Sequence, residues 1–213
     1  MATYDLDEQE RLDELKAWWK RWGSMAMIGL AVVIAASAGW RYWQHRTLTQ
    51  SLEAAAVYEK LTQSLAANDA KAAREAGSML IDQYKGTAYA PRAAMLLAKL
   101  NVLGKDLKSA QAQLEWAVTN SKEPAVKDLA RLRLAGVQLD QKQYDAALKT
   151  LSATHSDAYA FRFHDAKGDV LLAQGKQAEA RAAYQAAFGK MQEDDPYRSI
   201  VELKLDALGG EVK

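Results

Sequence analysis

The residues best suited to acid-base or metal chemistry are three histidines, His45, His155 and His164. A metal site built on one helix usually needs a second histidine four residues away, and none of the three has one. A turn could bring His155, Asp157 and His164 together, but a surface position or a satisfied core position explains each histidine as well. Histidine chemistry therefore has little support in the sequence, and we expect no metal.

Other catalytic arrangements are missing as well. The sequence contains no cysteine, which excludes disulfides and thiolate chemistry. It has no glycine-rich phosphate-binding loop and no strained nucleophile turn. The acidic run Glu193-Asp194-Asp195 precedes a predicted helix, where carboxylates cap the helix and complement its dipole. We therefore predict a protein that is not an enzyme and binds no cofactor.

Charge balance limits the kinds of partner. From Thr47 onward the chain has 22 Lys and Arg against 21 Asp and Glu. Such a balanced segment has no basic field to attract nucleic acid and no polybasic patch for a lipid surface. We expect no nucleic-acid partner, which leaves contacts with other proteins.

The segment that must position everything else is a run of nineteen uncharged residues from Trp22 to Trp40. At about 1.5 Å per residue, a helix of this length just crosses a bilayer core of about 30 Å. Residues that prefer the membrane interface bracket the run, and these anchors are Trp18, Trp19, Trp22, Trp40, Arg41, Tyr42 and Trp43. We predict a single transmembrane helix in the lipid bilayer.

Flanking charges predict the orientation of this helix. Four basic residues lie within about fifteen residues before the run and two follow it, a bias that favours a cytoplasmic N-terminus and an exported remainder. The alternative is a signal peptide cleaved after Ala36-Ser37-Ala38, which would release the remainder. Its first region would be long and acidic, so we expect an uncleaved anchor.

The chain beyond the anchor is rich in alanine, has three prolines and shows no sustained alternating pattern, so we predict helices throughout. One stretch has the spacing of a tetratricopeptide helix pair, with Gly168, Leu171, Gly175, Ala180, Tyr184 and Ala187. In such a pair, Gly168 and Ala180 let two antiparallel helices touch, Tyr184 fills the space beside them, and Gly175 ends the first helix.

The same frame recurs upstream. Equivalent alanines at Ala73, Ala110, Ala147 and Ala180 are 37, 37 and 33 residues apart, close to the tetratricopeptide period of about 34. Pro91 and Pro124 stand where first helices of pairs should begin. Asp195 followed by Pro196 should open a last helix, which runs through Ile200, Leu203 and Leu208 and stops at Gly209-Gly210.

These signals predict an all-α protein with an N-terminal transmembrane helix, a tetratricopeptide-like α-solenoid of about four helix pairs and a C-terminal capping helix. The long interval without Gly or Pro after Gly39 predicts that the helix continues from the membrane until it breaks near Asn68. The expected parts are a cytoplasmic tail (1–21), a transmembrane anchor (22–43), a linking helix (44–66) and a periplasmic repeat domain (67–213).

Two contact surfaces follow from this arrangement. Within the span, Ala31, Ala35 and Gly39 fall four residues apart and form a small-residue stripe that would let another transmembrane helix approach, although small residues are common in such helices.

In the solenoid, the first helix of each pair lines an inner groove, which the repeat frame assigns to Arg92, Met95, Lys99, Leu132, Gly136, Leu139, Arg162, Asp169 and Leu172. Mixed apolar and charged groups suit a transient extended or helical peptide, and they lack the regular Lys and Asn pattern that clamps a C-terminal carboxylate.

The junction Gly39-Trp40-Arg41-Tyr42-Trp43, the acidic-then-basic N-terminal tail and the repeat segment 144–151 (YDAALKTL) together resemble the ancillary SecYEG translocon subunit family, the YfgM-like proteins of bacterial inner membranes. The resemblance covers nearly the whole chain. It implies a single-pass inner-membrane protein with a periplasmic repeat domain. The implied partners are the SecYEG translocon, a membrane-anchored periplasmic chaperone like PpiD, and unfolded or emerging polypeptides that are passed on to periplasmic chaperones.

The residues alone support only a membrane-tethered helical-repeat adaptor. A periplasmic scaffold for envelope or cell-division machinery, released by cleavage after Ala38, is the alternative that the sequence leaves open.

Overall fold

The computed structural model describes the backbone of residues 3–209 and the side chains of residues 11–209. Every regular element in this range is helical, so the predicted all-α fold class is confirmed. The chain divides into two units, residues 1–50 and residues 51–213. In chain order the elements are α1 (Thr3–Ala66), α2 (Ala70–Gln83), α3 (Tyr89–Leu103), α4 (Leu107–Asn120), α5 (Pro124–Asp140), α6 (Tyr144–Leu151), the 3-10 turn η1 (Asp157–Tyr159), α7 (Ala160–Ala173), α8 (Gln177–Phe188) and α9 (Arg198–Asp206).

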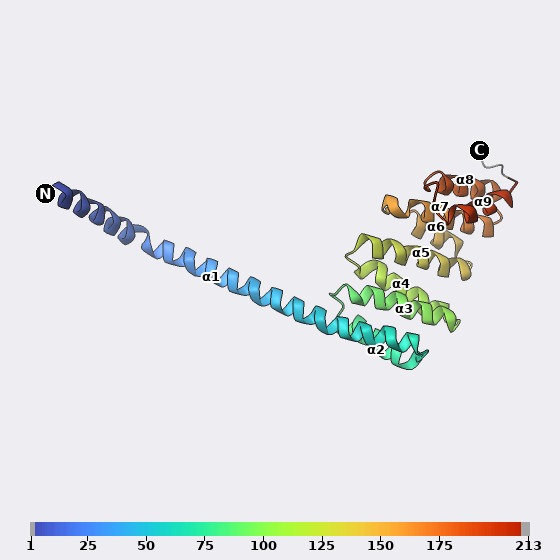
Figure 1. Cartoon of the computed structure of the whole chain (residues 1–213), viewed down its shortest axis with the longest axis horizontal. Coiled ribbons are helices and arrows are strands. Elements are labelled where there is room, and N and C mark those ends of the chain that lie inside the picture. The colour runs from blue at the N-terminus through green and yellow to red at the C-terminus, as the bar shows by residue number, and fades with distance from the viewer. Residues whose placement is uncertain (1–2, 210–213) are drawn as a thin grey trace. The chain divides into compact units, whose positions relative to one another are not determined.

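The second unit is a stack of helix pairs. The end of α1 pairs with α2, and α3 with α4, α5 with α6 and α7 with α8 follow, with α9 against the last pair (Figure 1). Each core cluster joins one pair to the first helix of the next, so the hydrophobic core runs continuously along the stack. This is the predicted solenoid of four pairs with a capping helix.

The turns between the two helices of each pair repeat with the same backbone conformation. Asn68, Lys105, Lys142 and Gly175 have φ angles of 56°, 61°, 60° and 79°. Each stands five residues before the equivalent alanine of its pair, so these residues share the offsets of 37, 37 and 33. The residue after this left-handed position can then donate its backbone N–H to the carbonyl of the residue five positions earlier. The Asp106 N–H, for example, donates to Asn101 O at 2.8 Å. The sequence marked the turns at Asn68 and Gly175 but not those at Lys105 and Lys142.

Close packing within a pair depends on small residues at the contact. A Cβ built on Gly168 would lie 2.4 Å from a ring carbon of Tyr184, which is fully buried. Ala180, also fully buried, completes the contact from α8. The predicted roles of Gly168, Ala180 and Tyr184 are therefore confirmed. Gly136 differs, since a Cβ there would meet nothing within 4 Å.

Two helices begin where the sequence predicts, and a third begins later than predicted. Pro124 is the first residue of α5 and Pro91 lies in the first turn of α3, as predicted. The prediction that the last helix opens at Asp195 and Pro196 is wrong, because Asp195 Oδ1 accepts the Tyr197 N–H at 2.8 Å in a turn and α9 begins only at Arg198. Leu208 lies beyond the end of α9, and Gly209 has a φ of +72°. Gly210 lies outside the described residues.

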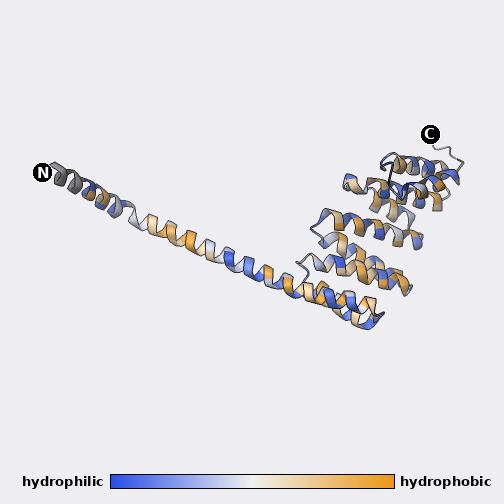
Figure 2. Cartoon of the chain, viewed as in Figure 1, coloured by the Kyte–Doolittle hydropathy of each residue, from blue (hydrophilic) through white to orange (hydrophobic). Residues whose placement is uncertain are grey.

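The first unit contains the apolar part of α1. An 18-residue window of this helix has a mean hydropathy of 1.7, and only 6% of the window is buried within the protein. Figure 2 shows this hydrophobic band between more polar segments of α1. By length and composition the helix could cross a membrane.

Substituting Gly168→Ala should destabilise the repeat unit by about 1–3 kcal/mol, because the added methyl would overlap a buried aromatic ring that cannot easily move. Gly136→Ala is the matched control, and it should be neutral or stabilise by up to about 1 kcal/mol through helix propensity. Urea unfolding followed by circular dichroism measures both. Equal effects of the two substitutions would contradict the close-contact interpretation.

Substituting Lys142→Gly should raise the free energy of unfolding by about 1 kcal/mol, because a lysine with φ of 60° carries strain that glycine does not. Gly175→Ala should lower it by a similar amount at the equivalent turn, where a Cβ meets no neighbour and only backbone strain acts. The same urea titration tests both, and a destabilising Lys142→Gly would show that the lysine side chain matters more than its φ angle.

Candidate functional site

Three cavities follow one another along the first helices of the repeat pairs. The first lies between the end of α1 and α3 and measures about 340 Å³, the second lies between α3 and α5 at about 390 Å³, and the third lies between α5, α7 and the start of α9 at about 490 Å³. We call this row of cavities the groove. Because successive first helices lie side by side, each gap between them leaves room for a few side chains of a partner.

The cavities share residues at their borders. Lys99 lines both the first and the second cavity, and Arg133 lines both the second and the third. Both side chains are exposed. The apolar part of the lining includes Leu96, Leu100 and Leu103 in the first cavity, Met95, Val102 and Val137 in the second, and Leu129, Leu132 and Ala166 in the third. The groove therefore alternates apolar hollows with cationic side chains.

Five of the nine residues predicted for the groove line these cavities. Met95, Lys99 and Gly136 lie in the second cavity, and Leu132 and Arg162 lie in the third. Met95 is largely buried, whereas Lys99 and Arg162 are exposed and free to meet a partner. Repeat spacing thus places side chains that are up to 67 positions apart in the sequence along one groove.

Arg92 lies outside the cavity lining and is held by a neighbouring repeat. Its guanidinium donates two hydrogen bonds to the carboxylate of Glu123, at 2.8 and 2.6 Å, and one to Ala88 O at 2.6 Å. The hydrogen bonds from Arg92 lower the pKa of Glu123, and the same contact raises the pKa of Arg92. Arg92 therefore links the start of α3 to the start of α5.

The other three predicted groove residues also lie outside the cavity lining. Leu139 is partly buried and packs against the core cluster of α5, α6 and α7. Asp169 accepts hydrogen bonds from Tyr184 Oη and Lys204 Nζ. Leu172 is 39% exposed and lines none of the three cavities.

Sequence reasoning missed several lining residues of the groove. Arg133 stands one position after the predicted Leu132, and Asp140 stands four after Gly136. A wider helical face, drawn at steps of three and four around Gly136, would have included both. Tyr159 and Tyr197 reach the third cavity from η1 and from the residue before α9. No repeat signal marks these two tyrosines.

A partly buried polar network lies at the C-terminal end of the groove. Lys204 Nζ of α9 donates to Asp165 Oδ1 and to Asp169 Oδ1 of α7, each at 2.7 Å. Tyr197 Oη donates to Asp165 Oδ2 at 3.0 Å, and Tyr184 Oη donates to Asp169 Oδ1 at 2.8 Å. The Asp165 side chain is 7% exposed, so the ammonium of Lys204 is what balances its charge. The network fixes α9 on the last pair.

This network moves three pKa values in one direction. Burial alone would lower the pKa of Lys204, but its hydrogen bonds to Asp165 and Asp169 outweigh burial and raise it. Burial, together with Asp169, raises the pKa of Tyr184, and burial together with Asp165 raises that of Tyr197. All three groups therefore keep their protons at neutral pH.

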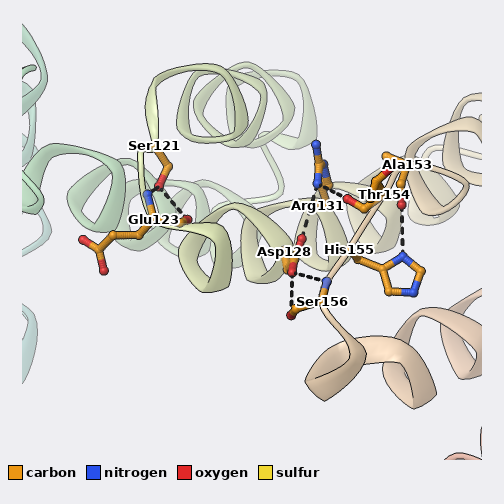
Figure 3. Close-up of polar contacts among 8 residues, drawn as sticks. All are labelled: Ser121, Glu123, Asp128, Arg131, Ala153, Thr154, His155 and Ser156. Atoms are coloured by element: carbon orange, nitrogen blue, oxygen red, sulfur yellow. Dashed lines mark hydrogen bonds and ion pairs between the residues drawn. The ribbon is translucent and has the colours of Figure 1, made fainter.

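His155 lies in the turn before η1 and α7, where Figure 3 shows a second polar cluster, whereas His164 lies within α7 and His45 within α1. Buried Asp128 of α5 accepts the N–H and the hydroxyl of Ser156, at 3.0 and 2.9 Å. Arg131 donates to Asp128 at 3.3 Å and to Thr154 O at 2.8 Å (Figure 3). These bonds attach the turn between α6 and η1 to α5, so the cluster has a structural explanation.

His155 packs against its neighbours, and His164 is partly buried within α7. His155 stacks on Phe163 with ring centroids 4.1 Å apart. Its Nδ1 lies 3.0 Å from Ala153 O (Figure 3). Burial lowers the pKa of His164, and repulsion from His155, Lys167 and Lys190 adds to that effect. Among residues 11–209, no group of three His, Cys, Asp or Glu side chains could hold a metal.

In the first unit, the predicted interface anchors lie on the surface of α1. Exposed fractions run from 46% for Trp22 to 69% for Tyr42, and Trp40 and Trp43 have ring centroids 5.5 Å apart. Ala31, Ala35 and Gly39 are exposed too, and a Cβ on Gly39 would meet nothing within 4 Å. Within the described residues the stripe is therefore uncovered.

Comparison with known proteins gives consistent similarities. A family model described as a tetratricopeptide repeat-like domain matches residues 16–210. A relative from Neisseria gonorrhoeae named ancillary SecYEG translocon subunit is 32% identical over 209 residues, which cover 98% of this chain and 100% of the relative. Relatives of the same name from Haemophilus influenzae and Escherichia coli are 29% and 28% identical, over 87% of this chain and 90% and 89% of their own lengths.

Substituting Lys204→Met should lower the free energy of unfolding by about 2–4 kcal/mol, because Asp165 would stay buried without its cation. Lys167→Met, at an exposed position of α7, is the control and should change it by less than about 0.5 kcal/mol. Urea unfolding at pH 8 measures both.

The same titration above pH 10 tests the sign of the pKa shifts. A group whose folded-state pKa is raised stabilises the fold fully below its ordinary pKa, and this contribution is lost as the pH rises through the folded-state value. Lys204, Tyr184 and Tyr197 are all of this kind, so stability should fall from about pH 10 upward, less steeply in Lys204→Met. Identical slopes in the two proteins would exclude a role for the network.

Proposed function

The chain belongs to the ancillary SecYEG translocon subunit family, and from that premise we propose that it is a membrane-tethered accessory subunit of the SecYEG translocon. The observation that carries this proposal is the similarity to relatives of that name over 98% of the chain, which includes both the apolar helix and the repeats. The protein acts through protein contacts and not through catalysis. Helical repeats of this kind present an extended surface for such contacts.

The apolar part of α1 is the anchor in this proposal. Residues 22–43 cross the inner membrane, residues 1–21 stay in the cytoplasm, and the repeat unit lies in the periplasm. The excess of basic residues before the span supports this orientation. The exposed tryptophans at both ends of the span support its depth, since such rings prefer the headgroup region.

The groove is the working surface. It receives segments of newly exported polypeptides and passes them, with a membrane-anchored periplasmic chaperone like PpiD, to further periplasmic chaperones. Support comes from the three cavities, each of a size that holds a few side chains, and from the exposed Lys99 and Arg162 beside them. Within the membrane, the stripe of Ala31, Ala35 and Gly39 provides close contact with a transmembrane helix of the partner.

Purification of the full chain from membranes in mild detergent, through a C-terminal tag, tests this function. We expect SecY and a periplasmic chaperone to be retained, and both should be lost when residues 22–43 are replaced by an unrelated transmembrane segment. Ala35→Leu should lower the yield of SecY at least about threefold, because a larger side chain blocks close approach. Ala36→Leu, about 100° around the helix, is the matched control and should not.

Other outcomes would overturn the proposal. Retention of cell-wall or envelope factors without channel subunits would favour the scaffold alternative. Mature protein in the soluble fraction that begins near Gly39 would show that the span is a cleaved signal and not an anchor.

A further inference from the structure

We propose that the groove selects acidic segments, namely stretches of protein in which Asp or Glu side chains alternate with large apolar ones. This inference rests on the proposed function, since it requires that the groove bind polypeptide at all. It goes beyond that function because it assigns a charge preference to the site. The carboxylates it takes are side chains within a segment and not a chain end.

The basic residues of the groove carry the argument. Lys99, Arg133 and Arg162 line the cavities, all three are exposed, and none of them forms an ion pair with another residue in the described part of the chain. Cations beside apolar hollows gain most from a carboxylate that arrives together with an apolar side chain, because the partner then excludes water from the contact.

Three other arginines of the repeats are already engaged by neighbouring elements. Arg92 holds Glu123, Arg131 holds Asp128, and the guanidinium of Arg198 lies 3.6 Å from the ring centroid of Phe188. These contacts join neighbouring elements, so they are part of the fold. Arg133 makes no such link, and Arg162 lies beside aromatic rings but has no carboxylate partner, so the charge of both arginines stays available to a partner.

The acidic residues of the groove do not cancel this charge. Asp165 lines the third cavity, but Lys204 already binds it, and Tyr197 donates to its second oxygen. Asp169 is bound by Lys204 as well. Asp140, in the second cavity, is the one carboxylate lining the three cavities of the groove, among the described residues, that has no ion pair. Three free cations therefore face one free anion.

The geometry of the third cavity strengthens the preference. The Arg162 guanidinium lies 5.1 Å from the ring centroid of Phe161 and 5.4 Å from that of Tyr197. Stacking of this kind orients a guanidinium while leaving its N–H groups free to donate. Arg133 lines the same cavity from α5, next to Leu129 and Leu132. Two arginines beside leucines suit a carboxylate next to an apolar anchor.

Two fluorescent amphipathic peptides test the preference, with leucines at identical positions and either Glu or Lys between them. Each is titrated with the full chain in detergent and followed by anisotropy. We expect the Glu peptide to bind about tenfold more tightly than the Lys peptide at low salt, and the difference to shrink as salt is added. The variant Arg133→Glu/Arg162→Glu should lose this preference, and Arg133→Lys/Arg162→Lys should retain most of it.

The matched control is Lys108→Glu/Lys149→Glu, which changes the net charge equally at exposed positions of α4 and α6. It should retain the preference. Equal binding of the two peptides, or an equal loss in the control, would overturn the charge preference and leave the groove as a general peptide site. Failure of both peptides to bind would overturn the proposed role of the groove itself. Displacement of the Glu peptide by vesicles of anionic lipid would instead assign the arginines to a membrane surface.

Discussion

Close contact between the two helices of each repeat is the constraint on which the rest of the structure depends. At Gly168 the backbone of α7 approaches the ring of Tyr184 so closely that an added Cβ would overlap the ring unless one of them shifts. The second helix of a pair covers this face of the first helix. The two sides of the first helix contact the neighbouring repeats, so one face of it remains open. The groove lies along that face, so its position follows from packing before any ligand is considered.

The sequence predicted this packing well because small residues at fixed spacing have one simple explanation. It predicted the turns less well. Lys105 and Lys142 adopt the same left-handed conformation as Gly175, yet lysine carries no turn signal of its own. Their conformation follows from the repeat, in which a chain must reverse within a fixed number of residues. Alignment of the repeats at Ala110, Ala147 and Ala180 would have shown that the two lysines and Gly175 occupy the same turn position. The turn requires a left-handed backbone at that position even where the residue is not glycine.

The groove was predictable in part for a similar reason. Lys99 and Gly136 lie at equivalent positions of two first helices, 37 residues apart, and Met95 lies about one turn before Lys99, so a single projected line finds all three. Arg133 lies beside that line, because the open face is wider than one row of side chains. Tyr197 comes from the turn before α9 and is held by Asp165 through a bond between elements 32 residues apart. Sequence periodicity has no means of finding a contact that only the capping helix creates.

The size and charge of the cavities suit rapid exchange better than tight capture. Cavities of about 340, 390 and 490 Å³ hold a few side chains each, so a bound segment would divide its apolar contacts among separate shallow sites. No single site then dominates the affinity, and a segment can leave one cavity while it still occupies another. Exposed cations accelerate the first encounter, and their contribution to the affinity shrinks as salt screens them. A surface built in this way favours fast association and fast release, which is what the proposed transfer between a channel and a chaperone requires.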